Sequence, residues 1–342
     1  LNDSQAMTTD TIFAIASMTK AITTVATLQL VEQGQIDLDT PITAYLPDLE
    51  HLKVLDGFDD DGKPMLSSPK TSPTTRQLLT HTSGYVYEIW NANGLQSVAS
   101  EQIDSLFAEG GNGMMAPLAF SPGERWEYGI GIDWAGRIVE ALSRKGLDTY
   151  FEDHIFSPLG MQDSFYNVPK EKASRRAAIH ARLDTGLEVA PHIGESVSGG
   201  GGLSSTIADY LRFMRSILNR GELDGAVILQ PKTVDMMFEN QIGNLDVMPG
   251  TSQMPDISNH FDMGFGAPAK WGLGFLIHGD QTESGRPKGS VSWAGLFNSY
   301  FWIDRENDLC AIIGTQVLPF YDTHAVAMLK DFESAIYKNL NS

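Results

Sequence analysis

The sequence predicts an α+β fold in which an antiparallel sheet is flanked by helices and interrupted by an inserted, mainly helical domain. Three observations support this prediction: an amphipathic helix near the start of the chain, helical spacing through the middle, and strand-like segments before a last helix. Because the first helix and the late strands enclose the helical part in sequence, we expect a discontinuous α/β domain of residues 1–73 and 265–342 around a helical domain of residues 74–264.

The first helix begins at the sequence Ser17-Met18-Thr19-Lys20. Apolar residues recur from there at helical spacing as far as Val31, and Gly34 follows as a C-terminal cap. Ser17 and Lys20 are three residues apart, so their side chains share one face of the first turn. A lysine near the positive end of a helix, in apolar surroundings, loses its proton more readily and can then accept the proton of a serine hydroxyl. The backbone N–H of Ser17, unpaired at a helix start, can point at a developing oxyanion.

The Ser-x-x-Lys spacing alone is weak evidence for a catalytic pair, because about one such sequence is expected by chance in a chain of this length. Ser67-Ser68-Pro69-Lys70 has the same spacing but lies in a loop rich in proline and serine, where no helix fixes the side chains. The helical position of Ser17 therefore makes it the candidate nucleophile.

The middle of the chain contains several segments with helical spacing. The predicted helices cover residues 74–79, 102–108, 132–143, 149–155, 207–219 and 231–240. His81, alone in a turn after the first of them, is expected to be structural rather than a catalytic base. Ser198–Ser204 is rich in glycine but lacks the Lys-Ser/Thr of a phosphate-binding loop, so it predicts close backbone packing.

Short extended segments and a turn are expected between residues 51 and 72. The acidic cluster Asp59-Asp60-Asp61-Gly62 resembles part of a calcium loop, but Gly57 and Ser68 stand where two ligands are required. The cluster therefore predicts a turn between extended segments.

Strand patterns and a helix complete the chain. The predicted strands are residues 271–278, 290–293, 299–303 and 309–315, and the helix covers residues 320–340. Arg305-Glu306-Asn307-Asp308 predicts the turn of an antiparallel hairpin. Cys310 falls in the last apolar run, which indicates a buried strand position rather than a reactive thiol.

Composition excludes several classes of protein. The 342 residues carry a formal net charge of −19, which argues against nucleic acid and an anionic membrane surface as partners. A single cysteine excludes an intrachain disulfide framework and a cysteine-rich metal site, and no metal or cofactor is expected. Apolar runs are too short to span a bilayer, and Leu1–Thr11 is too polar for a signal peptide, so we expect a cytoplasmic location, with the periplasm as the alternative.

Two common hydrolase motifs are missing from the sequence. There is no Gly-x-Ser-x-Gly of an α/β-hydrolase and no His-Glu-x-x-His of a zinc peptidase. The remaining serine chemistry is a Ser–Lys pair, completed by another proton carrier and a second oxyanion donor.

Six motifs in one order resemble the serine β-lactamase-like hydrolases, a group that includes the class C and penicillin-binding-protein-like enzymes. They are Ser17–Lys20, Leu78–Gly84, Phe120–Gly123, Tyr128, Gly199–Leu203 and Trp293–Gly295. The resemblance covers nearly the whole chain. Within this group, the chain most resembles the family VIII carboxylesterases. It implies a β-lactamase/transpeptidase-like fold, with an antiparallel sheet flanked by helices and an inserted all-helical domain.

The resemblance also implies roles for individual residues. Ser17 would be the acylated nucleophile, and Lys20 would activate it. Tyr128, which matches the tyrosine of a Tyr-x-Asn motif, would carry the proton to the leaving group and then help to activate water. Trp293-Ala294-Gly295 takes the place of Lys-Thr-Gly, and Leu296 would give the second oxyanion N–H.

Two departures from the lactamase pattern favour a small neutral ester as substrate. The positions of the Lys and the Asn that hold a lactam substrate carry Trp293 and Ile130, which cannot make the charge-assisted contact of a lysine. Trp126, Trp293 and Phe320 are the expected apolar walls of the site. We therefore expect a carboxylesterase, with a β-lactamase or D,D-peptidase, an acyltransferase and an inactive scaffold as alternatives.

The segment before the nucleophile is shorter than the resemblance implies. Proteins of this kind place a helix and two strands there, whereas only sixteen residues precede Ser17. Without those strands, we expect the sheet to have an open apolar edge near Trp271–His278 and the protein to associate with copies of itself.

Overall fold

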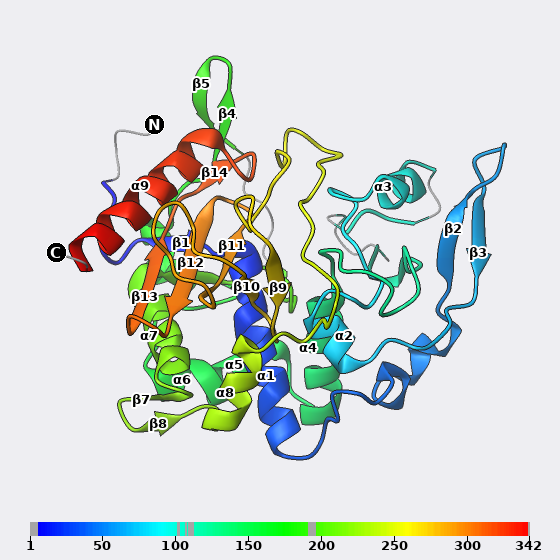
Figure 1. The fold of residues 1–342 in the computed structure, drawn as a ribbon, viewed down its shortest axis with the longest axis horizontal. Coiled ribbons are helices and arrows are strands. Elements are labelled where there is room, and N and C mark those ends of the chain that lie inside the picture. Colours follow the sequence, from blue (N-terminus) through cyan, green and yellow to red (C-terminus); the bar gives the residue numbers. More distant parts are fainter. Residues whose placement is uncertain (1–5, 101–102, 107, 109–112, 191–195, 341–342) are drawn as a thin grey trace.

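The computed structural model describes residues 6–100, 103–106, 108, 113–190 and 196–340. In this part of the chain the main sheet has five antiparallel strands in the order β13-β12-β11-β10-β9 (Figure 1). The strands are β9 (Ala269–Trp271), β10 (Leu276–His278), β11 (Val291–Gly295), β12 (Ser299–Asp304) and β13 (Leu309–Ile313). The predicted hairpin is confirmed, because β12 and β13 pair across the turn with Asp304 opposite Leu309.

Helices precede and follow this sheet in the described chain. They are α1 (Thr19–Glu32), α2 (Thr75–Leu79), α3 (Ala92–Ala99), α4 (Gly131–Ser143), α5 (Leu147–Phe151), α6 (Ser157–Leu159), α7 (Ile207–Leu218), α8 (Pro231–Phe238) and α9 (Thr323–Leu340). Most of the predicted helices are therefore confirmed with slightly different ends.

One predicted helix is wrong and one was missed. Residues 103–106 of the predicted helix 102–108 form bends and turns, while residues 102 and 107 lie outside the described residues. The helix of this region is α3, which begins after Asn91 because the Asn91 side chain accepts the N–H of Gly94 at 2.8 Å.

Helices cover both faces of the sheet. Phe301 of β12 contacts Tyr210 of α7, with ring centroids 5.4 Å apart. Its neighbour Trp302 donates from Nε1 to the Tyr337 hydroxyl of α9 at 3.1 Å. Successive residues of a strand point to opposite faces, so α7 and α9 lie on opposite sides of the sheet (Figure 1). This double cover explains why β11 and β12 are buried along their whole length.

Smaller sheets of two or three strands position loops around the core. They are formed by β1 (Ile12–Ala14), β2 (Val54–Phe58), β3 (Pro64–Ser67), β4 (His180–Leu183), β5 (Gly186–Val189), β6 (Ser204–Thr206), β7 (Glu222–Leu223), β8 (Ala226–Val227) and β14 (Val317–Leu318). The predicted turn at residues 59–62 is confirmed, because it joins β2 and β3 in a projecting hairpin (Figure 1). β1 pairs with β6, so the segment before Ser17 lies beside the end of the glycine-rich turn.

The sheet edge near Trp271–His278 is not open, which corrects the sequence-based expectation. The N–H of Gln241 donates to the carbonyl of Trp271 at 2.8 Å, and the N–H of Val247 donates to that of Ala269 at 3.1 Å. These bonds use outward-facing carbonyls of β9, so the chain covers this edge itself. The argument for self-association at this edge therefore fails.

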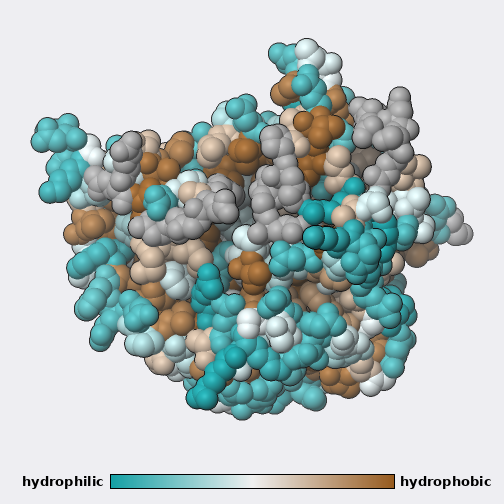
Figure 2. All heavy atoms as spheres, turned by 180° about the vertical axis from the view of Figure 1, so that it is seen from behind, coloured by the Kyte–Doolittle hydropathy of each residue, from teal (hydrophilic) through white to brown (hydrophobic). Residues whose placement is uncertain are grey.

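On the face shown in Figure 2, hydrophilic and apolar side chains mix in small groups. Within the described residues, no helix has both the length and the apolar character needed to cross a bilayer.

Candidate active site

Ser17 lies on a short 3₁₀ turn, Ala16–Met18, that leads directly into α1. The turn is held from one side because the N–H of Ile15 donates to the carbonyl of Leu203 at 2.9 Å. Ala16 has φ = +44°, a conformation that costs a residue with a side chain roughly 1–3 kcal/mol. The surrounding contacts thus impose a strained turn that leaves Ser17 partly exposed, while Lys20 is buried.

The end of β11 lies against this turn because residue 295 is glycine. A Cβ atom on Gly295 would lie 2.5 Å from the carbonyl oxygen of Ile15, closer than atoms can approach. Leu296 follows in a tight turn, closed by the N–H of Asn298 donating to the Gly295 carbonyl at 3.0 Å. The backbone of Leu296 is therefore next to the Ser17 turn, where the resemblance places the second oxyanion donor.

Lys20 makes three hydrogen bonds through Nζ. It donates to Ser17 Oγ at 3.3 Å, to the Tyr87 hydroxyl at 2.8 Å and to the carbonyl of Gly200 at 2.7 Å. An ammonium has three N–H donors, so this environment satisfies the charged form completely. A neutral amine keeps two donors for Tyr87 and Gly200 and turns its lone pair to the Ser17 hydroxyl. The geometry therefore suits a lysine that takes a proton from serine.

Tyr87 is a site residue that the sequence analysis missed. Burial, and to a lesser extent the charge of Asp133, raise the pKa of Tyr87 well above its usual value, so its hydroxyl stays protonated. It accepts from Lys20, and its own O–H points to Asp133 Oδ2 at 3.5 Å. Tyr87 lies three residues after the Leu78–Gly84 motif, but a single tyrosine at that distance has no spacing that would identify it.

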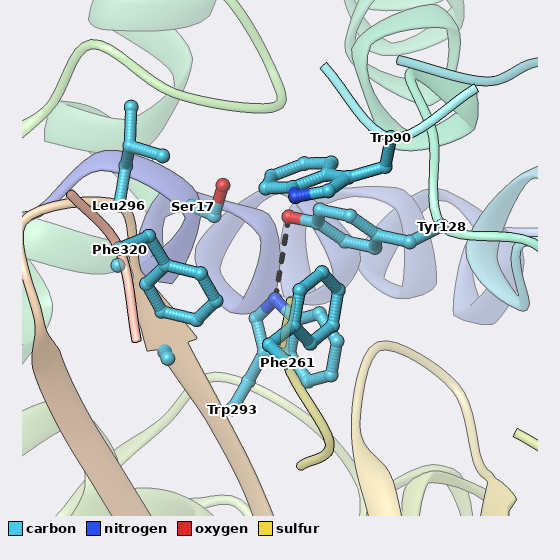
Figure 3. Close-up of a pocket in the computed structure, with 9 residues that line it drawn as sticks. Ser17, Trp90, Tyr128, Phe261, Trp293, Leu296 and Phe320 are labelled. Atoms are coloured by element: carbon cyan, nitrogen blue, oxygen red, sulfur yellow. Dashed lines mark hydrogen bonds between the residues drawn. The ribbon is translucent and has the colours of Figure 1, made fainter. Parts of the chain in front are cut away.

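Tyr128 lies in the same cluster but is linked differently. Its hydroxyl accepts a hydrogen bond from Trp293 Nε1 at 3.3 Å (Figure 3). Lys20 Nζ is 5.1 Å from the centre of the Tyr128 ring. The tyrosine that accepts a hydrogen bond from Lys20 is therefore Tyr87, whereas Lys20 approaches Tyr128 over its ring.

His81 packs behind Tyr128, with ring centroids 4.7 Å apart. Its Nδ1 accepts the N–H of Gly129 at 3.3 Å. Burial, and then the charge of Lys20, lower the pKa of His81 well below its usual value, so the ring is neutral. These contacts agree with the structural role predicted for His81.

A narrow pocket opens above Ser17. It has a volume of about 20 Å³ and is lined by Ser17, Trp90, Tyr128, Phe261, Trp293, Ala294, Gly295, Leu296 and Phe320 (Figure 3). The structure thus places Trp293, Ala294, Gly295, Leu296 and Phe320 around one pocket with Ser17 and Tyr128.

Two predicted substrate-binding residues do not line this pocket. Ile130 is the residue before α4, and its side chain belongs to the buried core because the chain turns into the helix there. Trp126 packs against Trp271, with ring centroids 5.5 Å apart, and faces a different cavity. Trp90 and Phe261 take their places, and both come from irregular segments whose direction no sequence period indicates.

A larger cavity of about 270 Å³ adjoins the narrow pocket. Trp90, Tyr128 and Phe261 line both, so these rings form an aromatic partition between them. The remaining walls of this outer cavity are Arg125, Trp126, Glu127, Met248, Pro249, Gly250 and Thr251. The charges of Arg125 and Glu127 are paired with each other at 2.9 Å, so the cavity is mainly apolar with a balanced charged rim.

A partly exposed serine beside a buried lysine, at the head of a core helix and against the end of a sheet strand, defines a serine acyl-transfer enzyme of the β-lactamase/transpeptidase-like fold. The chain belongs to the Beta-lactamase family, whose model matches residues 1–330. This confirms the resemblance and the fold class predicted from the six motifs.

The similar proteins include enzymes that make or cleave esters. The chain is 34% identical to monacolin J acid methylbutanoyltransferase of Aspergillus terreus, over 96% of this chain and 82% of that protein. It is 31% identical to lovastatin esterase of Penicillium rubens, over 97% and 86% respectively. The LovD9 mutant of simvastatin synthase from Aspergillus terreus superimposes with a TM-score of 0.86 at 33% identity, over 100% of this chain and 88% of that one. The protein is thus an ester-processing enzyme.

Proposed function

We propose that the protein is a carboxylesterase that cleaves esters of short acyl chains through an acyl-enzyme on Ser17. The observation that carries this proposal is the hydrogen bond between Lys20 and Ser17 Oγ at the base of a narrow, apolar pocket. A pocket of this size suits a short acyl group better than a long chain. The narrower assignment to the family VIII carboxylesterases is part of the same proposal.

The proposed reaction has two balanced steps. Ser17 Oγ attacks the ester carbonyl carbon while its proton passes to Lys20, and the oxyanion accepts hydrogen bonds from the backbone N–H groups of Ser17 and Leu296. The C–O bond then breaks, Tyr128 donates a proton to the leaving alkoxide, and the acyl group stays on Ser17. Water attacks this acyl-enzyme and gives a proton to the Tyr128 phenolate. The bond between Ser17 Oγ and the acyl carbon then breaks, Ser17 takes its proton back from Lys20, and the carboxylic acid is released.

The Ser17 pocket is poorly suited to an anionic β-lactam. Trp293, which takes the place of the lysine, offers one N–H, and Tyr128 already accepts it. A charge-assisted contact to a substrate carboxylate is worth roughly 1.5–3 kcal/mol, and none of the residues that line the pocket is a cation. A neutral ester does not need this contact and gains apolar contact with the rings.

Parallel assays of p-nitrophenyl butyrate and nitrocefin test the esterase proposal. We expect kcat/KM to be far higher for the ester, with Ser17→Ala inactive and Lys20→Met slower by about a hundred-fold or more. Labelling by a fluorophosphonate, followed by peptide mass spectrometry, should find the adduct on Ser17. Equal or better turnover of nitrocefin would restore the lactamase alternative, and an unlabelled Ser17 would favour an inactive scaffold.

Acyl transfer to an alcohol is a second candidate function, and the outer cavity favours it. The cavity has room for an apolar alcohol. Its hydroxyl would reach the acyl group on Ser17 past the aromatic partition that the two cavities share. The names of two relatives, a methylbutanoyltransferase and an esterase, show that related enzymes use both acceptors. An alcohol hydroxyl would replace water in the second step, with the same proton acceptors.

Product partitioning separates the two candidates. The purified enzyme is given p-nitrophenyl butyrate with an apolar alcohol as acceptor, and the butyrate ester of that alcohol and free butyric acid are quantified. A transferase forms the new ester in preference to acid although water is in large excess. If only acid forms at saturating alcohol, hydrolysis is the function.

A further inference from the structure

Asp133, in the first turn of α4, lies behind the candidate active site. Its Oδ1 accepts the N–H of Gly200 at 3.0 Å and also the hydroxyl of Ser198, while Oδ2 accepts the hydroxyl of Tyr87 at 3.5 Å. The positive end of α4 favours a carboxylate at this position. One side chain thus binds both the glycine-rich turn and the tyrosine beside Lys20.

Two of the residues that Asp133 binds, Gly200 and Tyr87, also accept hydrogen bonds from Lys20. Lys20 donates to the carbonyl of Gly200 at 2.7 Å and to the Tyr87 hydroxyl at 2.8 Å. We propose that Asp133 is a positioning residue for Lys20, because its carboxylate fixes both of these acceptors from behind. This inference rests on the proposed role of Lys20 as the base for Ser17.

The glycine-rich turn is shaped around this carboxylate. A Cβ atom on Gly200 would lie 2.0 Å from Asp133 Oδ2, so the turn can approach the carboxylate only with glycine at this position. The preceding Gly199 is held by Thr23 of α1, whose hydroxyl donates to the Gly199 carbonyl at 2.7 Å. The backbone packing that the sequence analysis expected here therefore places a carbonyl acceptor against the candidate base.

Asp133 also acts on the charge of Lys20. The titratable groups that face Lys20 from the surrounding segments are His81, Tyr87 and Tyr128, and Asp133 follows behind Tyr87. His81 and Tyr87 are neutral, for the reasons given above, so the Asp133 carboxylate supplies the negative charge on this side. A negative charge favours an ammonium over an amine. Asp133→Asn removes this charge even when the geometry is kept.

The pH dependence of Ser17 labelling by a fluorophosphonate tests this inference in the full chain. Asp133→Asn keeps an acceptor for Gly200 but removes the charge. The pH midpoint is the pH at which the labelling rate reaches half of its plateau. We expect the pH midpoint of Asp133→Asn to lie about half a unit to one unit below that of the wild type. Asp133→Ala, which loses the charge and the contacts with Tyr87, Ser198 and Gly200, should also label about ten- to a hundred-fold more slowly at the plateau.

Ser198→Ala is the matched control, because it removes one partner of Asp133 and keeps the charge. Its pH midpoint should equal that of the wild type, and its labelling rate should stay within a few-fold. A folded Asp133→Asn protein with the wild-type midpoint and rate would overturn the inference.

A second variant covers the case in which Asp133→Asn does not fold. Gly200→Ala should displace the carboxylate and slow labelling by at least ten-fold, and wild-type labelling by Gly200→Ala would equally overturn the inference. A wild-type protein that the probe does not label contradicts the proposed function itself, so the two failures are distinguishable.

Discussion

Replacing Tyr87 by phenylalanine is the sharpest test of the hydrogen-bond network at the candidate site. The change removes one oxygen atom and leaves the aromatic ring, which packs 5.3 Å from the Tyr128 ring. Lys20 loses the acceptor at 2.8 Å and keeps those at Ser17 and Gly200. Lys20 Nζ is then left with one N–H unpaired in a buried site, or with an amine that is free to turn away from Ser17.

The expected magnitude follows from the loss of one hydrogen bond to a charged group. Such bonds contribute about 1.5–3 kcal/mol, and each 1.36 kcal/mol is a factor of ten in rate. We therefore expect kcat/KM for p-nitrophenyl butyrate to fall by about 10- to 150-fold in Tyr87→Phe. The loss should be in acylation, measured by stopped-flow release of p-nitrophenol, because deprotonated Ser17 is required there.

Tyr85→Phe is a matched control from the same segment. The Tyr85 hydroxyl is buried and has no hydrogen-bond partner within the described residues, so its removal breaks no contact with Lys20. We expect Tyr85→Phe to retain wild-type kcat/KM and at least wild-type stability. If Tyr87→Phe also retained wild-type acylation while folded, the network would have no role in activating Ser17.

Three further predictions concern packing and charge. Gly295→Ala should lower both the melting temperature and the rate of Ser17 acylation, because its Cβ would meet a backbone carbonyl oxygen at 2.5 Å; Gly201→Ala, with open space at its Cβ, should change neither in thermal melts and burst assays. Glu333→Gln should destabilise the protein by about 3–5 kcal/mol in urea unfolding, since it leaves the buried guanidinium of Arg286, 2.6 Å away, without its counter-charge; a loss below 1 kcal/mol would contradict this. Burial, and then the charge of Arg286, lower the pKa of His278 well below its usual value, so the unfolded chain binds this proton more readily than the folded one. The contribution of His278 to the free energy of unfolding is therefore complete above about pH 6.5 and falls by up to about 1.4 kcal/mol per pH unit below it. Between pH 7 and pH 5, the free energy of unfolding measured in urea should fall less for His278→Gln than for the wild type.

Local sequence patterns determined much of the fold. The helix after Ser17, the turn at residues 59–62 and the hairpin turn at residues 305–308 all depend on residues close in sequence, and each is present in the structure. The position of Ser17 and Lys20 on one turn has the same local origin, so the pair could be singled out without a structure. The ordered motifs added the fold class, because together they cover most of the chain.

Only the tertiary structure decided which distant side chains meet at Lys20. Tyr87 and Gly200 reach it from 67 and 180 residues away, and Asp133 reaches it through them. No periodicity or spacing encodes such an encounter, because it depends on how the helices and the glycine-rich turn pack.

Packing also decided the walls of the pocket and the edge of the sheet. Trp126 and Ile130 are close to Tyr128 in sequence, yet both side chains point elsewhere once the chain turns into α4. Trp90 and Phe261 come from irregular segments that become walls only when loops are fixed on the core. In the same way, a loop segment around Gln241 covers the strand edge that seemed open. A sequence reports local backbone preference and burial, whereas the direction of a side chain in a loop is set by contacts made across the whole molecule.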